Sequence, residues 1–186
     1  MYPDPITPRA FPEILSRLDY DPFKVMPEDF PPAPRVFTTG AQIKRAIERI
    51  RDGIPADTEG LKQLLTACRL DEPLPVYKDE GGPPDWGGPL MPWLNLAFRN
   101  ALAARLTGDE RHRRRALEAM RLAASATAKI SKWTGHEHNE AIAASRAYDL
   151  LASTPLEPDD DNAMRGMLWM LHHGLDFLGH RACNNH

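Results

Sequence analysis

Apolar residues recur along the second half of the chain at alternating steps of four and three, which is the spacing of one helix face. A first stripe consists of Leu90, Leu94, Ala97, Ala101 and Ala104, and a second of Ala116, Met120, Ala123, Thr127 and Ile130. Gly108 and Asp109 stand between the two stripes. Because glycine often follows the last turn of a helix and aspartate often caps the next one, this pattern predicts a tight antiparallel hairpin of two helices.

Two more helices are predicted after this hairpin. One covers about 136–152, with an apolar stripe of Ala141, Ala144, Tyr148 and Leu151. The other begins at Pro158, which suits a first helical turn, and its aspartates at 159–161 face the positive end of the helix dipole. Gly179 is expected to end this helix, whose stripe is Met164, Leu168, Leu171, Leu175 and Leu178.

The apolar arc of this last helix is wide, because Met167 and Trp169 lie outside the stripe. A single neighbouring helix cannot cover all of these side chains. We therefore expect some of them, Trp169 or Met170 first, to be exposed or to be covered by a neighbouring molecule or by the Pro-rich arm.

The first half of the chain contains two predicted helices and much irregular sequence. One helix begins at Thr38 or Thr39 and stops at Gly53, with Ile43, Ala46, Ile47 and Ile50 on one face. A second covers about 56–70, and "DEGGPPDWGGP" then breaks all regularity. Nine of the 18 prolines fall within the first 34 residues. Because proline opposes helix, residues 1–36 are expected to form an extended arm, with at most a short helix over 9–18.

No segment alternates with period two, so the fold class predicted is all-α, built of helical hairpins. The hairpins differ in loop length and cap chemistry, and no fixed repeat of about 34 residues is found. This irregularity favours a toroid or an irregular bundle over a regular repeat scaffold.

Composition narrows the function classes. The chain is 42% hydrophobic and 26% charged with a net charge of −3, so no global charge indicates a nucleic-acid or anionic-membrane partner. Cys68 and Cys183 have no metal or redox spacing and are expected to be reduced thiols. The N-terminus resembles no export signal and no segment is long enough to span a bilayer, which favours a cytoplasmic location over a periplasmic or secreted one.

Several segments occur in an order that resembles one family. They are "PPAPRVFTTGAQIKRAIERIRDG", "ARLTGDERHRRRALEAM", "ISKWTGHEHNEAIAASRAYDLLA", the helix start "LEPDDD" and the final "NNH". This order, from about Pro31 to His186, is similar to that of the heparinase II/III-like polysaccharide lyases. Each motif alone is common in folds of paired helices, and the order carries the resemblance.

The resemblance implies that residues 37–186 form the N-terminal part of an incomplete (α/α) toroid. It implies an acidic, uronate-containing polysaccharide as substrate, no cofactor and no metal. Asn185 and His186 match the family's catalytic pair, in which the Asn binds the uronate carboxylate and the His assists. Asn184, Trp133, His136 and His138 are expected to line the substrate cleft. The proton-transfer Tyr would follow His186, so this chain alone is expected to be inactive.

The residue types suit the chemistry. Elimination from a uronic acid removes the proton next to the carboxylate, so negative charge develops on the carboxyl group. An amide N–H or a cationic imidazole held against that group lowers the barrier. The alternative for "NNH" is a frayed polar C-terminus.

Other segments are weaker candidates. "HEHNE" at 136–140 lacks the second histidine of a zinc helix, because residue 140 is Glu. Trp133 could stack on a sugar ring or pack in the core. The arginine-rich run at 111–115 could attract an acidic polysaccharide, although a solvated helix face is the more common role. His172 and His173 are expected to be partly buried structural residues.

Two other function classes stay open. One is a helical scaffold or binding domain in which "NNH" has no role. The other is an α/α-toroid glycoside hydrolase, which needs two carboxylic acids facing across a cleft. Asp and Glu fall mainly at helix caps and on expected helix surfaces, so no such pair stands out.

Overall fold

The computed structural model describes residues 33–34, 36–76, 88–127 and 137–182, and of 137, 138 and 172–182 it describes the backbone alone. The described residues form helices and no strand, which confirms the all-α class. These helices are α2 (Gly40–Arg51), α3 (Pro55–Ala67), α4 (Met91–Thr107), α5 (Glu110–Thr127), α6 (Glu137–Leu151) and α7 (Pro158–Ala182). None of the described helices combines the length and the apolar character that a membrane span requires.

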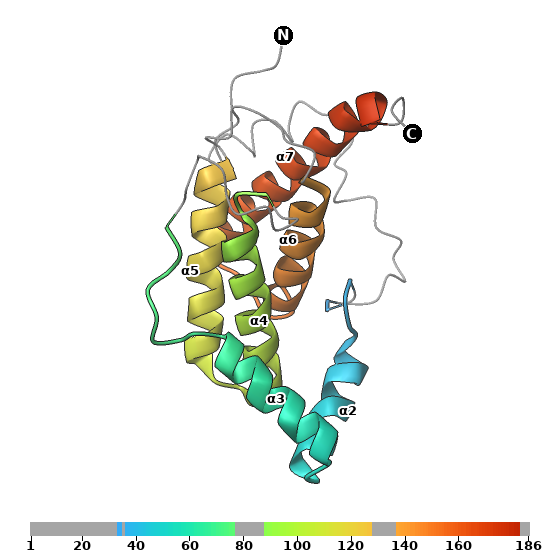
Figure 1. Cartoon of the computed structure of the whole chain (residues 1–186), viewed down its shortest axis with the longest axis vertical. Helices are drawn as coiled ribbons and strands as arrows, with labels where there is room; N and C mark the ends of the chain where they lie inside the picture. Colours follow the sequence, from blue (N-terminus) through green and yellow to red (C-terminus); the bar gives the residue numbers. More distant parts are fainter. Residues whose placement is uncertain (1–32, 35, 77–87, 128–136, 183–186) are drawn as a thin grey trace.

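The helices pack as two antiparallel hairpins, α4 with α5 and α6 with α7, with α2 and α3 beside the lower part of the bundle (Figure 1). Glu140 of α6 contacts Leu90 at the start of α4, so these two helices run in the same direction. Arg121 of α5 binds Asp160 of α7. Helices α5 and α7 run in the direction opposite to that of α4 and α6 (Figure 1). The bundle therefore has an upper end, where α4 and α6 begin and where α5 and α7 end.

Local sequence signals set most helix ends. Thr39 caps α2, and its side chain and that of Gln42 bond to each other's backbone N–H groups in a capping box. Gly108 follows α4 with a left-handed φ of 72°, and the Asp109 carboxylate accepts a hydrogen bond from the N–H of Arg111 at 2.9 Å. α7 begins at Pro158 as predicted. These caps confirm the boundaries that glycine, proline and short polar residues predict.

The predicted stripes of α4 and α5 form the centre of the core. Leu90, Leu94, Ala97, Ala116, Met120 and Ala123 are all fully buried. The small alanine side chains let α4 and α5 approach closely, and α4 is covered by α5, α6 and α3 on different sides. On α6 the buried face is wider than the predicted stripe and also includes Ala143, Ala147 and Leu150.

Much of the wide apolar arc of α7 is covered within the chain. Met164, Met167 and Leu171 are buried, and Met170 is only 9% exposed. Trp169 is half-buried. Both α5 and α6 pack against α7, and two neighbours cover a wide arc. The helix also continues past Gly179 to Ala182, because a glycine inside a helix costs only about 1 kcal/mol and does not by itself end it.

The segment before α2 lies against α4 and α6. The N–H of Val36 donates to a carboxylate oxygen of Asp149 at 2.7 Å. The Phe37 ring meets the Phe98 ring edge-on at 5.0 Å, and the guanidinium of Arg146 lies over the Phe37 ring. The described residues 33–34 and 36–39 form no helix, whereas residues 1–32 and 35 lie outside the described part of the chain.

Candidate functional site

The residues that the resemblance singles out fall almost entirely outside the described part of the chain. These residues are Trp133, His136, Asn184, Asn185 and His186. His138 lies in the first turn of α6, where the backbone alone is described. Their side chains therefore have no described geometry, and the site is built from the helix ends that lead to them.

These helix ends share the upper end of the bundle (Figure 1). α6 begins at Glu137, directly after the segment with Trp133 and His136. α7 ends at Ala182, two residues before Asn184. α4 begins beside the start of α6, as the contact between Leu90 and Glu140 requires. Two predicted groups that are 46 residues or more apart in sequence are therefore attached to the same end of one bundle.

Glu140 is a buried charged residue at this end of the bundle. Its side chain is 1% exposed, and its carboxylate accepts a hydrogen bond from the N–H of Leu90 at 2.7 Å. A Cβ atom added to Gly88 would overlap this carboxylate, so Gly88 gives it room. Glu140 thus fixes the chain that enters α4 against the first turns of α6.

A second buried carboxylate, Asp149, lies near the other end of α6 and is 4% exposed. It accepts the hydrogen bond from Val36 described above. These two residues are exceptions to the prediction that acidic residues lie mainly in caps and on helix surfaces. Nine residues of helix separate them by about 13 Å along the axis, and each accepts a backbone N–H bond. Their described role is to hold incoming segments of chain, which differs from that of a facing pair of catalytic acids.

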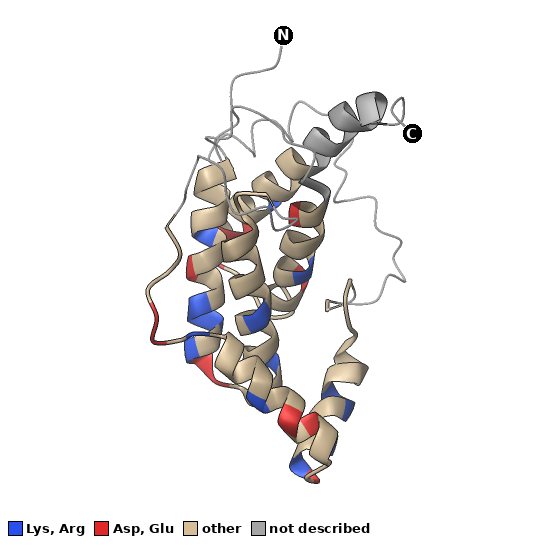
Figure 2. Ribbon diagram, viewed as in Figure 1, with Lys and Arg blue, Asp and Glu red and all other residues tan. Residues whose placement is uncertain are grey.

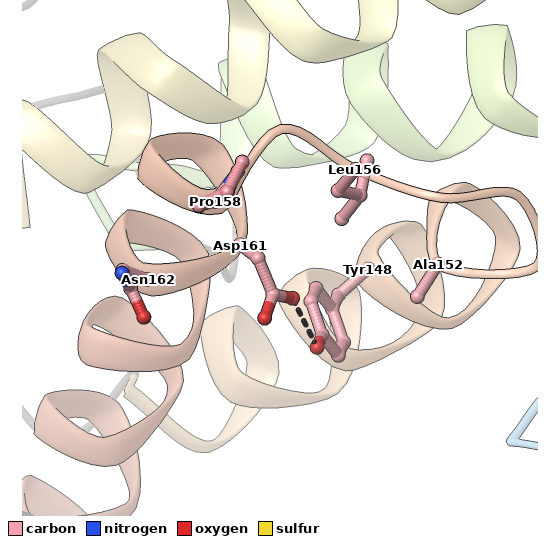
Figure 3. A pocket seen from close by; sticks show the side chains of 6 residues that line it. All are labelled: Tyr148, Ala152, Leu156, Pro158, Asp161 and Asn162. Carbon is pink, nitrogen blue, oxygen red and sulfur yellow. Dashed lines mark hydrogen bonds between the residues drawn. The ribbon is translucent and has the colours of Figure 1, made fainter.

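A hollow of about 430 Å³ lies where α6 ends and α7 begins. There the hydroxyl of Tyr148 donates a hydrogen bond to Asp161 at 2.7 Å, and the two side chains point toward one another in Figure 3. Tyr148 lies ten residues after His138 on the same helix, which corresponds to about 15 Å along its axis. This tyrosine therefore belongs to a different part of the bundle from the upper end.

The arginine-rich run at the start of α5 is largely occupied by contacts within the chain. Arg111 pairs with Asp109, Arg113 pairs with Glu110 and bonds the Pro155 carbonyl, and Arg115 bonds the carbonyls of Arg69 and Glu72. Figure 2 shows these basic positions on the lower half of α5, with acidic positions at the start of the helix and further along it. The arginine-rich run thus holds neighbouring segments of the chain together. It lies far from the upper end of the bundle, where the residues predicted to bind polysaccharide are attached.

The described cysteine, Cys68, is a free and fully buried thiol. Burial raises the pKa of Cys68 to about 11, so the thiolate is scarce at neutral pH. This agrees with the predicted reduced thiol, since a buried thiol with a raised pKa is a poor nucleophile at ordinary pH. Cys183 lies outside the described residues.

Sequence reasoning missed Glu140 as a buried group, although a signal for it exists. Glu140 precedes Ala144 by four residues, so it continues the buried face of α6 toward the helix start. A carboxylate on an apolar face must have a partner, and a backbone N–H at the start of another helix is a common one.

Comparisons of the chain with protein-family models, with curated proteins and with solved structures find no match.

Proposed function

We propose that this chain is the N-terminal part of a lyase that cleaves uronate-containing polysaccharide by β-elimination, as its resemblance to heparinase II/III-like lyases implies. The observation that carries the proposal is the common attachment of the two predicted groups to the upper end of the bundle. The segment with Trp133 and His136 enters α6 there, and α7 leads to Asn185 and His186 from the same end.

The proposed roles follow from the reaction. Asn185 donates its amide N–H to the uronate carboxyl group, where charge develops as the C–H bond breaks. His186 assists at the same centre, and a tyrosine beyond His186 transfers the proton. Trp133, His136, His138 and Asn184 bind the sugar rings on either side of the cleaved bond.

Glu140 supports this arrangement as a positioning group. The start of α6 carries His138 and follows His136, and the bond from Glu140 to Leu90 holds this start against α4. A rigid scaffold of this kind is needed because catalytic groups must be held within a fraction of an ångström of their productive geometry.

The test is a direct assay of the full natural product of the gene that encodes this chain. Alginate, heparan sulfate and hyaluronan each serve as a substrate, and the unsaturated uronate formed by elimination absorbs in the ultraviolet. A neutral glucan of similar length is the control. We expect enzyme-dependent growth of absorbance on at least one acidic polysaccharide and none on the glucan.

Two outcomes would count against the proposal. Reducing sugar released without ultraviolet absorbance would indicate hydrolysis, which is the glycoside-hydrolase alternative. No cleavage of any uronate polysaccharide by the folded protein would favour the helical scaffold or binding domain.

A further inference from the structure

A second hollow, of about 440 Å³, lies at the lower end of the bundle, away from the proposed lyase site. The end of α3 and the turn after it form one wall, and the connection between α4 and α5 forms the other. Its volume falls in the range of small-molecule sites. The predicted function makes no use of it.

His112 lines this hollow and is only 4% exposed, and its tautomer is fixed by Asn100. The Asn100 amide nitrogen lies 2.9 Å from the Cys68 carbonyl oxygen and 3.0 Å from that of Leu96, so it donates to both. The Asn100 amide oxygen must then be the atom that lies 2.9 Å from Nδ1 of His112. Since this oxygen can only accept, Nδ1 carries the hydrogen.

The other ring nitrogen, Nε2, therefore has a free lone pair in the neutral imidazole. Nδ1 faces Asn100 in the core, so Nε2 is the polar ring atom that remains for the hollow. Burial lowers the pKa of His112, which favours the neutral, accepting form at pH 7. His112, oriented by Asn100, thus supplies an acceptor to the lining of the hollow.

Among the charged residues around the hollow, Asp71 is a second hydrogen-bond acceptor beside His112. Both lining arginines are engaged, Arg111 with Asp109 at 2.7 Å and Arg69 with Glu72 at 3.4 Å. Asp71 lines the same hollow and forms no hydrogen bond or salt bridge with any described residue, although its charge helps to raise the pKa of Arg111. Nε2 of His112 and the carboxylate of Asp71 thus accept no hydrogen bond from a described residue, and one of these acceptors is neutral and the other anionic.

We propose that this hollow binds a small organic cation, a protonated primary amine with an apolar body. Its ammonium group donates to Nε2 of His112 and lies against the carboxylate of Asp71, and its hydrocarbon part contacts Leu65 and Leu70. An anion would meet three carboxylates here, while the two arginines that could receive it are already paired. This site is independent of the proposed lyase activity.

The test is a titration of the full chain with benzylamine, which is protonated at pH 7. Benzyl alcohol and benzoate are matched probes that have the same ring with a neutral or an anionic group. We expect saturable binding of benzylamine and at least about 10-fold weaker binding of the other two, since a charge-assisted hydrogen bond contributes roughly 1.5–3 kcal/mol. In two-bond ¹H–¹⁵N spectra of the imidazole, Nε2 of His112 should shift more than Nδ1.

Substitutions test whether Asp71 and His112 form the binding site. Asp71→Asn and His112→Asn should each weaken benzylamine binding by about 10-fold or more, whereas Asp52→Asn on the remote surface of the α2–α3 hairpin should leave it unchanged. Asp71 is exposed, so its variant keeps the fold even if His112→Asn does not. Equal affinity for the three probes, no saturable binding, or unchanged affinity in Asp71→Asn would overturn the proposal.

Discussion

The carboxylate of Glu140 accepts a hydrogen bond from the N–H of Leu90 at 2.7 Å, and this bond joins α6 to the residue that precedes α4. The two residues are 50 positions apart, and both are fully buried. Gly88 lies so close to the carboxylate that only a hydrogen atom fits in place of a side chain. The start of α4, the start of α6 and one glycine therefore form a single packed unit.

Gly88→Ala should destabilise the protein by about 1–3 kcal/mol, because the added methyl group overlaps a buried carboxylate that has little freedom to move. The matched control is Gly60→Ala. Gly60 lies inside α3 with open space around its Cβ position, so this variant should gain about 0.5–1 kcal/mol from helix propensity. Urea unfolding followed by circular dichroism measures both. A stable Gly88→Ala variant would show that the carboxylate can shift.

Glu140→Ala should cost about 2–4 kcal/mol of unfolding free energy, since it leaves a cavity and a buried N–H at Leu90 without its acceptor. Glu118→Ala, on the exposed face of α5, should change the stability by less than about 0.5 kcal/mol. The same unfolding experiment compares them. Equal stability of the two variants would mean that the Leu90 N–H finds another acceptor.

The guanidinium of Arg121 forms two hydrogen bonds with the carboxylate of Asp160, at 2.6 and 2.7 Å, and joins α5 to the start of α7. Arg121 is more than half exposed, so we expect a coupling free energy of only about 1 kcal/mol. A double-mutant cycle with Arg121→Lys and Asp160→Asn measures it. The coupling should fall in 1 M salt, and a coupling near zero at low salt would mean that the fork geometry contributes nothing.

Stability should decrease when the pH falls through the range in which His112 titrates. Burial lowers the pKa of His112 below its ordinary 6.5, with the nearby Arg111 also lowering it and Asp109 opposing. Below pH 6.5 the unfolded chain binds a proton at this position that the folded chain still rejects. The stability that neutral His112 provides is therefore complete above pH 6.5 and is lost as the pH falls from there to the folded-state pKa.

The measurement is the pH dependence of unfolding between pH 5 and 8 for the wild type and His112→Asn. The asparagine keeps an N–H close to the position of Nδ1 but does not titrate in this range. Asp109 stays ionised throughout, because its pKa is lowered to about 2 by Arg111. The part of the pH dependence that His112 contributes should disappear in the variant, and identical curves would contradict this.

Asn185→Ala in the full natural protein should lower the turnover of uronate polysaccharide by about 100- to 1,000-fold, because the lost donor acts mainly on the charge that develops in the transition state. The KM should change far less. Asn162→Ala, near the start of α7, is the matched control and should keep normal turnover. Near-normal turnover of Asn185→Ala would remove this residue from the proposed mechanism.

The sequence by itself determined the helices and most of their ends. Thr39, Gly108 and Pro158 act through their own backbone and its nearest turns, so their effect can be read without knowing what lies beside them. The stripes of α4 and α5 were also readable, because helical spacing places Leu94, Ala97 and similar residues on one face whatever the partner is.

Only the tertiary structure decided what the buried polar residues bind. Glu140 with Leu90 and Arg121 with Asp160 join residues 50 and 39 positions apart, and no local spacing predicts such pairs. The exposure of Met170 likewise depended on how many neighbours α7 has. The physical reason is that capping and periodicity are set within a few residues, whereas the burial of a charge or of an apolar flank depends on which distant helices pack against it.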